Sequence, residues 1–130
     1  MRLSLATKAR ADVGLAISHD CWHGSYRSFR LWRGNLARAA GLPPLDSMRG
    51  CGFGGTVSWE TLPSPEEDAL IVLLHHSDCD GEIASRDASR LADRLESLLP
   101  EIDADWRRRT MKFVDGLREA ASLGEDVEFR

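Results

Sequence analysis

The chain has 130 residues, of which 42% are hydrophobic and 29% charged, and its formal net charge at pH 7 is −4. This length suits one domain spanning residues 1–130, with a core that requires neither disulfides nor a metal ion. The mild charge, with both signs interspersed, argues against the basic surface of nucleic-acid-binding proteins, so we do not expect nucleic acid as a partner.

Cysteine usage and hydropathy indicate where the protein works. The three cysteines, Cys21, Cys51 and Cys79, cannot all pair within the chain. The first ten residues, MRLSLATKAR, are too polar for a secretory signal segment. The longest apolar run, residues 69–74, is far too short to span a bilayer. We therefore expect a cytoplasmic protein that does not enter a membrane.

The first part of the chain is predicted to form a strand and a helix. The segment DVGLAIS, residues 12–18, indicates a strand, and HDCWHGS, residues 19–25, indicates a polar turn. Ser25 can cap a helix over residues 26–41, which Gly41 ends. Four apolar residues of this helix share one face, namely Phe29, Trp32, Leu36 and Ala40.

Residues 43–63 are predicted to form a long irregular loop, in which only TVSW has the pattern of a strand. Loops of this length in small domains tend to be functional. Trp22 and Trp59 lie in or beside predicted loops and are candidates for a pocket or interface, whereas Trp32 and Trp106 lie on apolar helix faces and are expected in the core. These observations suggest one function class, a protein-interaction module that uses Trp22, Trp59 and the loop.

The segment after the loop carries a helix start signal. Ser64 can cap, Pro65 suits the first turn and Glu67 can complete a capping box, so we predict a helix over residues 65–76. Ser85 is expected to cap the following helix. The apolar face of that helix consists of Ala88, Leu91, Ala92, Leu95, Leu98 and Leu99.

The C-terminal part is predicted to contain one more helix, from about residue 103 to residue 122, and a final strand. The apolar stripe of the helix consists of Trp106, Thr110, Phe113, Leu117 and Ala120. The closing segment DVEFR, residues 126–130, would lie beside the first strand. Together the elements predict an α+β fold: a helix-dominated single domain with about four helices and a small sheet of two or three strands.

Basic residues concentrate in two segments, YRSFRLWRGNLAR at residues 26–38 and DWRRR at residues 105–109. The favoured interpretation is a solvated helix face, and the alternative is a face that contacts an anion or nucleic acid.

All four histidines lie in two short segments, SHDCWHG and HHSDCDG, which also contain aspartates and cysteines. If the two segments meet in space, their side chains would form one polar cluster, the candidate working centre of the protein. The candidate metal ligands are His19, His23, His75, His76, Asp78 and Asp80. Further candidates for the site are Asp20, Cys21, Cys79, Glu82, Trp22 and Trp59.

Calcium is one metal that this cluster suggests. When Gly81 is aligned with position 6 of an EF-hand loop, Asp78 falls at position 3, Asp80 at position 5 and Asp87 at position 12. His76 then occupies position 1, where a hard cation disfavours a nitrogen ligand, and position 12 holds an aspartate in place of the usual glutamate.

Zinc or a similar transition metal is the other metal alternative. Two or three histidines and a carboxylate, with one coordination position left open, would activate water and make the protein a metal-dependent hydrolase. No C-x-x-C spacing supports this hypothesis.

A structural interpretation without metal is favoured over both. A helix that ends at His75 and His76 is stabilised by imidazolium near its C-terminus, and Gly81 suits the positive φ of a turn. Asp78 and Asp80 could accept hydrogen bonds from backbone N–H groups.

A thiolate–imidazole pair is a further catalytic alternative. It would join Cys79 to His75 or His76, or Cys21 to His19 or His23. The neighbouring aspartates oppose it, because they raise the pKa of a thiol.

Four segments resemble a family of small uncharacterised proteins of actinobacteria and their phages. They are GSYRSFRLWRGNLARAAG, LLHHSDCDGEI, LADRLESLLP and FVDGLREAASLGEDVEF, and HHSDCDGEI is the most specific part. The resemblance implies a cytoplasmic accessory protein of phage or prophage origin that binds a host protein or a small molecule. It implies no activity and no catalytic residues.

Overall fold

A computed structural model of the protein describes residues 14–50, 53–77 and 81–129. The helices among these residues are α2 (Tyr26–Ala39), α3 (Leu70–Leu74), α4 (Ser85–Leu98) and α5 (Ala104–Leu123). The strands are β1 (Leu15–Ile17), β2 (Trp22–Gly24), β3 (Glu82–Ile83) and β4 (Val127–Glu128). This architecture confirms the predicted helix-dominated α+β domain.

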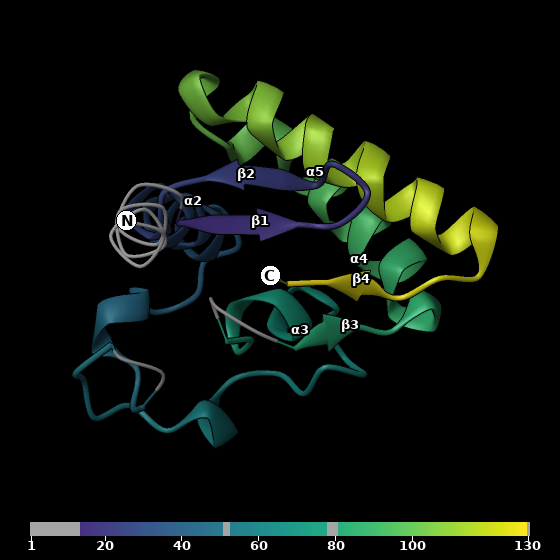
Figure 1. The fold of residues 1–130 in the computed structure, drawn as a ribbon. Coiled ribbons are helices and arrows are strands. Elements are labelled where there is room, and N and C mark those ends of the chain that lie inside the picture. Colours follow the sequence, from purple (N-terminus) through teal and green to yellow (C-terminus); the bar gives the residue numbers. More distant parts are fainter. Residues whose placement is uncertain (1–13, 51–52, 78–80, 130) are drawn as a thin grey trace, which may run out of the picture.

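The strands form two antiparallel pairs, β1–β2 and β3–β4, in place of the single small sheet that we predicted. In Figure 1 the four strands lie side by side in the order β2, β1, β4, β3. An isolated bridge between Ile17 and Phe129 joins the pairs, and the Ser18 N–H donates to the Glu128 carbonyl at 2.8 Å. The expectation that the C-terminal segment lies beside the first strand is confirmed at this bridge.

The core lies between the strands and the helices, and its centre is aromatic. Trp22 stacks on Trp32 with ring centroids 5.0 Å apart, and Trp32 contacts Phe113 at 4.9 Å. The indole N–H of Trp32 donates to the Thr110 hydroxyl at 2.9 Å, which satisfies the polar atom of a fully buried ring. Burying side chains of this size stabilises the fold by roughly 2–3 kcal/mol each.

The start of α2 follows the prediction closely. Ser25 is its N-cap and accepts a hydrogen bond from the Ser28 N–H at 3.0 Å. The start of α4 differs, because Ala84 takes the cap position and Ser85 is the first helical residue. The Ser85 N–H is satisfied by the Asp126 carboxylate at 2.9 Å, so a side chain from the C-terminal segment does the work of the predicted cap.

The predicted helix over residues 65–76 is wrong in its length, since only Leu70–Leu74 is α-helical. The capping box of Ser64 and Glu67 does form, with reciprocal hydrogen bonds of 2.9 and 3.2 Å, but it closes a separate turn. Asp68 accepts the Leu70 N–H at 3.0 Å just before the helix, whose N-cap is Ala69. The segment therefore contains two successive hydrogen-bonded starts, one at Ser64 and one at Asp68, and the helix after the second is little more than one turn long.

The loop over residues 43–63 contains two short 3-10 turns, Leu45–Ser47 and Trp59–Thr61. A bridge between Met48 and Val57 closes its middle, and the indole N–H of Trp59 donates to the Arg49 carbonyl at 2.9 Å. Among the described residues, no helix is long and apolar enough to cross a membrane.

Candidate functional site

The candidate metal ligands do not gather within the part of the chain that the structure describes. No group of three or more His, Cys, Asp or Glu side chains there is placed to hold a metal ion. Asp78, Cys79 and Asp80 lie outside the described residues. The zinc and calcium hypotheses therefore stay predictions, and the described candidates can be judged one by one.

His19 lies in the turn of the β1–β2 hairpin and connects it to the C-terminal segment. His19 and Asp20 have φ values of 59° and 58°, a left-handed conformation that is strained for residues with a side chain. The Ser18 hydroxyl lies 2.8 Å from His19 Nδ1, and His19 Nε2 lies 2.8 Å from a carboxylate oxygen of Glu125. Both ring nitrogens are therefore engaged in holding a strained turn.

The Ser18–His19–Glu125 row has the residue types of a hydrolase triad, but its surroundings oppose that chemistry. The Ser18 hydroxyl also accepts the Glu128 N–H at 2.8 Å, and the depression beside it is lined by Glu125, Asp126 and Glu128. Carboxylates at these positions would destabilise the oxyanion of acyl transfer, because such a transition state requires donors that stabilise negative charge. The row is a structural network.

Trp22 and His23 lie on β2, which corrects the prediction of a polar turn at residues 19–25. Trp22 is only 2% exposed, so its assignment to a pocket or interface is wrong and it belongs to the core. The period-2 alternation of a strand explains this, since it points Trp22 inward and leaves His23 exposed. The guanidinium of Arg109 lies 4.1 Å from the Trp22 ring centre and donates to the His23 carbonyl at 2.9 Å.

The second histidine pair is held by aromatic rings. His75 stacks on Trp59 with centroids 4.1 Å apart, and partial burial lowers the pKa of His75 below its ordinary value. His76 stacks on Phe129 at 4.0 Å. Its Nε2 lies 3.0 Å from the carbonyl oxygen of Glu82, and its Nδ1 lies 2.7 Å from that of Ser77. Both His76 nitrogens thus face carbonyl oxygens, and neither is directed toward a metal position.

Arg33 organises the end of α3, and sequence analysis missed it. This side chain is only 2% exposed and donates from one nitrogen to three carbonyls, those of Leu73, Leu74 and His76, at 3.3, 3.4 and 2.8 Å. Its guanidinium also lies 4.7 Å from the Phe29 ring centre. A cation at the last carbonyls of a helix replaces water there and complements the helix dipole. This contact supports a structural role for residues 75–77, with the Arg33 guanidinium in place of the predicted imidazolium at the helix end.

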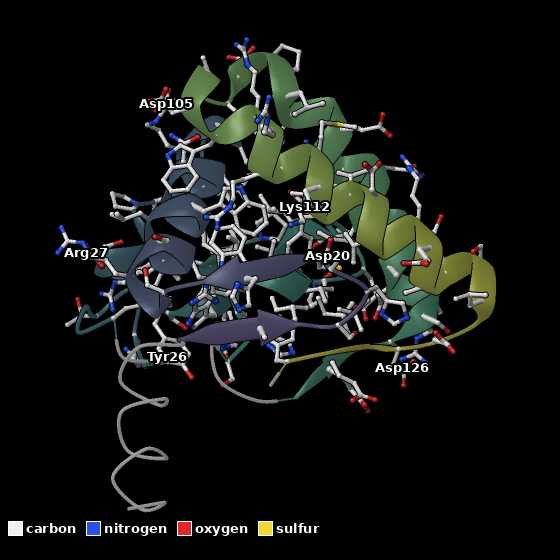
Figure 2. The ribbon with its side chains drawn as sticks, turned by 45° about the horizontal axis from the view of Figure 1, so that its top comes forward. Asp20, Tyr26, Arg27, Asp105, Lys112 and Asp126 are labelled. Atoms are coloured by element: carbon white, nitrogen blue, oxygen red, sulfur yellow. The ribbon has the colours of Figure 1, made fainter. Side chains whose placement is uncertain are left out.

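Cys21 is unsuited to nucleophilic catalysis. Burial raises the pKa of its thiol to about 12, and the charges of Asp20 and Glu119 add to the effect. The turn that carries Cys21 packs against α5, where Asp20 and Lys112 lie 3.5 Å apart (Figure 2). The thiol therefore behaves as a small apolar core group.

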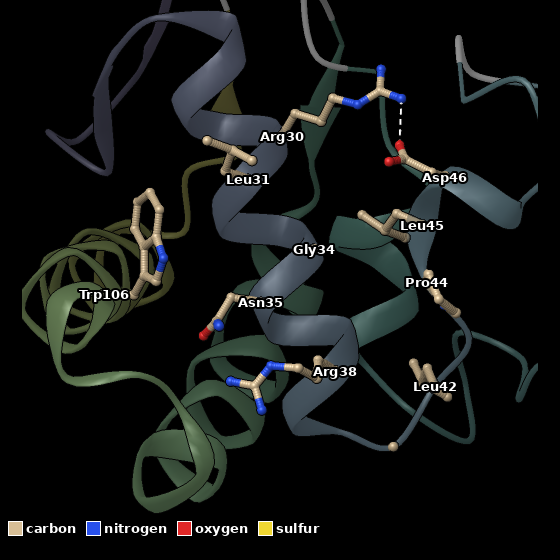
Figure 3. A pocket seen from close by; sticks show the side chains of 11 residues that line it. Arg30, Leu31, Gly34, Asn35, Arg38, Leu42, Pro44, Leu45, Asp46 and Trp106 are labelled. Atoms are coloured by element: carbon tan, nitrogen blue, oxygen red, sulfur yellow. Dashed lines mark hydrogen bonds and ion pairs between the residues drawn. The ribbon is translucent and has the colours of Figure 1, made fainter.

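A different surface of the molecule is open. We call it the α2 groove: a depression of about 670 Å³ that crosses the exposed side of α2 at Gly34 (Figure 3). Leu31 and Trp106 border it on one side, and Leu42, Pro44 and Leu45 on the other. The lining also includes Arg30, Asn35, Arg38, Gly41 and Asp46. Leu31 is 52% exposed and, together with the half-buried Trp106 and Leu42 and the exposed Pro44, gives the groove a contiguous apolar border.

Gly34 forms the floor of the groove, and nothing in the backbone requires a glycine there. It lies inside α2, and a Cβ added to it would meet no atom within 4 Å. Gly116 on α5 is the contrasting case, because an added Cβ would lie 2.5 Å from the Cys21 sulfur and 2.7 Å from the His19 carbonyl oxygen. A glycine inside a helix costs about 1 kcal/mol relative to alanine. At Gly116 packing explains this cost; at Gly34 the open space itself is what the glycine provides.

The groove residues were only partly accessible to sequence reasoning. Trp106 was expected in the core, yet it is half-buried and forms a groove wall. A signal did exist, since residues 27, 31, 34, 35 and 38 share one helix face and this face combines an apolar residue, a glycine and two arginines. That face is opposite the stripe of Phe29, Trp32 and Leu36, which agrees with the solvated helix face favoured for residues 26–38; the groove across it was not predicted.

Comparison of the chain with family models, with curated proteins and with solved structures finds no match. The function must therefore be inferred from the geometry of this chain alone.

Proposed function

We propose that the protein is a protein-binding accessory module, and that an apolar side chain of its partner enters the α2 groove. The observation that carries this proposal is Gly34, a helical glycine in the groove lining at which an added Cβ would meet no atom within 4 Å. Apolar walls and a missing side chain form a socket of the kind that receives the central anchor residue of a protein interface.

The shape of the site favours a protein over a small molecule as the occupant. The volume of about 670 Å³ lies within the range of small-ligand sites, but those sites enclose most of the ligand. Here Leu31, Arg38 and Pro44 are exposed, so the rim is a broad surface that a protein covers better. A cytoplasmic host protein is the partner class suggested by the resemblance to phage-associated proteins.

The proposal differs from our first functional hypothesis, which centred on the cluster of histidines, aspartates and cysteines. The described histidines of that cluster have their contacts within the fold: His19 with Glu125, His75 with Trp59, and His76 with Phe129. The α2 groove, in contrast, has an unfilled centre. The alternative of a metal-dependent hydrolase gains no supporting observation from the described residues.

The test uses two substitutions of one residue. Gly34→Phe fills the groove, Gly34→Ala leaves it almost unchanged, and neither side chain meets a clash at its Cβ. Peptides selected from a random displayed library on the wild-type protein should bind Gly34→Ala with similar affinity and Gly34→Phe at least about tenfold more weakly. Circular dichroism and thermal unfolding confirm that both variants are folded. If the selected peptides bind Gly34→Phe as well as wild type, or if no peptide is enriched, the proposed function is wrong.

A further inference from the structure

The two ends of the α2 groove carry arginines whose partners are exposed. Arg30 contacts Asp46 at 2.6 Å, and the side chains are 42% and 77% exposed. Arg38 contacts Asp103 at 2.7 Å, with side chains 58% and 61% exposed. Exposed ion pairs contribute only about 0–1 kcal/mol each. A partner's carboxylate can therefore take the place of Asp46 at Arg30, which also lies 5.1 Å from the Phe53 ring centre, or of Asp103 at Arg38, while Asp103 keeps the Asn35 amide at 2.8 Å.

The spacing of these arginines defines what can replace both carboxylates at once. Arg30 and Arg38 are eight positions apart on α2, which corresponds to about 12 Å along the helix axis. The open floor at Gly34 lies midway between them. Arg27 is exposed one turn before Leu31 and adds a third cation to the same helix face.

A helix and an extended strand can both span this distance, and backbone hydrogen bonding favours the helix. In a helix, residues four apart lie on one face, so two carboxylates eight positions apart also span about 12 Å, with one side chain midway between them. A helix satisfies its own backbone hydrogen bonds, whereas an extended peptide must find partners for its N–H and C=O groups. The centre of the groove is apolar, with the Asn35 amide as the uncharged polar side chain in its lining.

From these observations, and resting on the proposed function, we infer that the partner segment is an acidic amphipathic helix. It presents an apolar residue to Gly34 and a carboxylate one turn before and one turn after it, in the pattern acidic-x-x-x-apolar-x-x-x-acidic. In the free protein Asp46 and Asp103 occupy the positions of these two carboxylates. The basic segment at residues 26–38 was expected to be either a solvated face or an anion-binding face. In this inference it binds anions, namely the carboxylates of a partner protein.

The probes are alanine-based helical peptides with a fluorescent label, measured by fluorescence anisotropy. The first has Glu, Phe and Glu at positions i, i+4 and i+8; the others replace both Glu by Lys, replace Phe by Ala, or place Glu-x-Phe-x-Glu in an extended, proline-flanked peptide. The acidic helix should bind at least about tenfold more tightly than the Lys helix. Raising the salt concentration to about 0.5 M should reduce this preference, because exposed charges are screened.

Protein variants separate this inference from the proposed function. Arg30→Gln with Arg38→Gln should remove the preference for Glu over Lys and leave thermal stability nearly unchanged. Arg86→Gln is the control. Arg86 is an exposed arginine near the start of α4 and is not part of the groove lining, so its loss should not change the preference for Glu over Lys. If Glu and Lys helices bind equally and Gly34→Phe abolishes both, the acidic partner is wrong and the binding module stands.

Two other outcomes also overturn the inference. Tighter binding of the extended peptide would exclude the helix, and displacement of the acidic helix by a single-stranded oligonucleotide would make the arginines a nucleic-acid contact. If no helix binds and the library also yields no Gly34-dependent peptide, the proposed function fails together with the inference.

Discussion

The histidine-rich region, by which we mean the described residues of segments 18–24 and 75–81 with the part of α5 packed on them, and the α2 groove differ in what their polar and small residues contact. In the histidine-rich region, His19, His76 and Gly116 all meet other parts of the chain at close distance. In the groove, the cations Arg30 and Arg38 meet exposed carboxylates, and a Cβ added at Gly34 would meet no atom within 4 Å. A cluster of potential ligands in a sequence can therefore serve to hold the fold together. The contrast also suggests the α2 groove, with Gly34 in its lining, as the better candidate for binding.

The largest effect that would test this contrast is expected from Arg33→Met. The substitution keeps the apolar stem but removes the guanidinium that donates to the carbonyls of Leu74 and His76, while the Leu73 carbonyl keeps the His76 N–H. We expect a loss of about 3 kcal/mol in the free energy of unfolding, measured by urea denaturation. Arg27→Met, at an exposed position of the same helix, should change stability by less than about 0.5 kcal/mol. If the two substitutions have equal effects on stability, Arg33 does not stabilise the end of α3 at His75 and His76 as described.

A smaller loss is expected from Gly116→Ala. The added methyl group would lie 2.5 Å from the Cys21 sulfur and 2.7 Å from the His19 carbonyl oxygen, so the hairpin turn must move. Such overpacking destabilises by roughly 1–3 kcal/mol. Thermal unfolding monitored by circular dichroism measures it, and a neutral result would show that the turn packs loosely on α5.

The opposite sign is expected for Gly34→Ala. Nothing within 4 Å opposes the methyl group, and alanine is the better helix former. The free energy of unfolding should rise by about 0.5–1 kcal/mol. Measured in the same urea titration as Gly116→Ala, a destabilising effect here would mean that the floor of the groove is packed and that the site is smaller than described.

A pH effect is the next smaller test, and it concerns His75. Because partial burial lowers the pKa of His75, the unfolded chain binds the proton more readily than the folded one. Stability from this residue is present above the ordinary histidine pKa of about 6.5 and declines as the pH falls below it. His75→Gln should flatten the slope of Tm between about pH 7 and pH 5; an unchanged slope would exclude His75 as its source.

The smallest effect is expected from metal ions. Since both nitrogens of His76 face carbonyl oxygens and His19 is bound to Glu125, zinc or calcium should leave the Tm unchanged. Elemental analysis of protein purified without added metal is the second readout. A saturable rise in Tm, lost in His76→Gln, would support the metal-site hypothesis and weaken the contrast between the regions.

The sequence predicts the helices well where periodicity is long, as in α2 and α5, because many residues report one face. It fails at α3, where the signal at Ser64 and Glu67 describes a turn while Asp68 and the distant Arg33 set the limits of the helix. Trp22 shows the same limitation, since a strand of three residues is too short for its alternation to be distinguished from a turn. The groove was not predicted because its walls come from α2, from α5 and from the loop that follows α2. Only the tertiary structure brings these segments together.

The most direct test of the account is an NMR titration of the labelled protein with the Glu-Phe-Glu helix. The account predicts that the largest shifts occur at the amides of Leu31, Gly34 and Asn35 and at the Trp106 indole, while His75 and His76 stay unperturbed. The largest shifts at the two histidines, with Gly34 unchanged, would contradict it and would make the histidine-rich region the binding site.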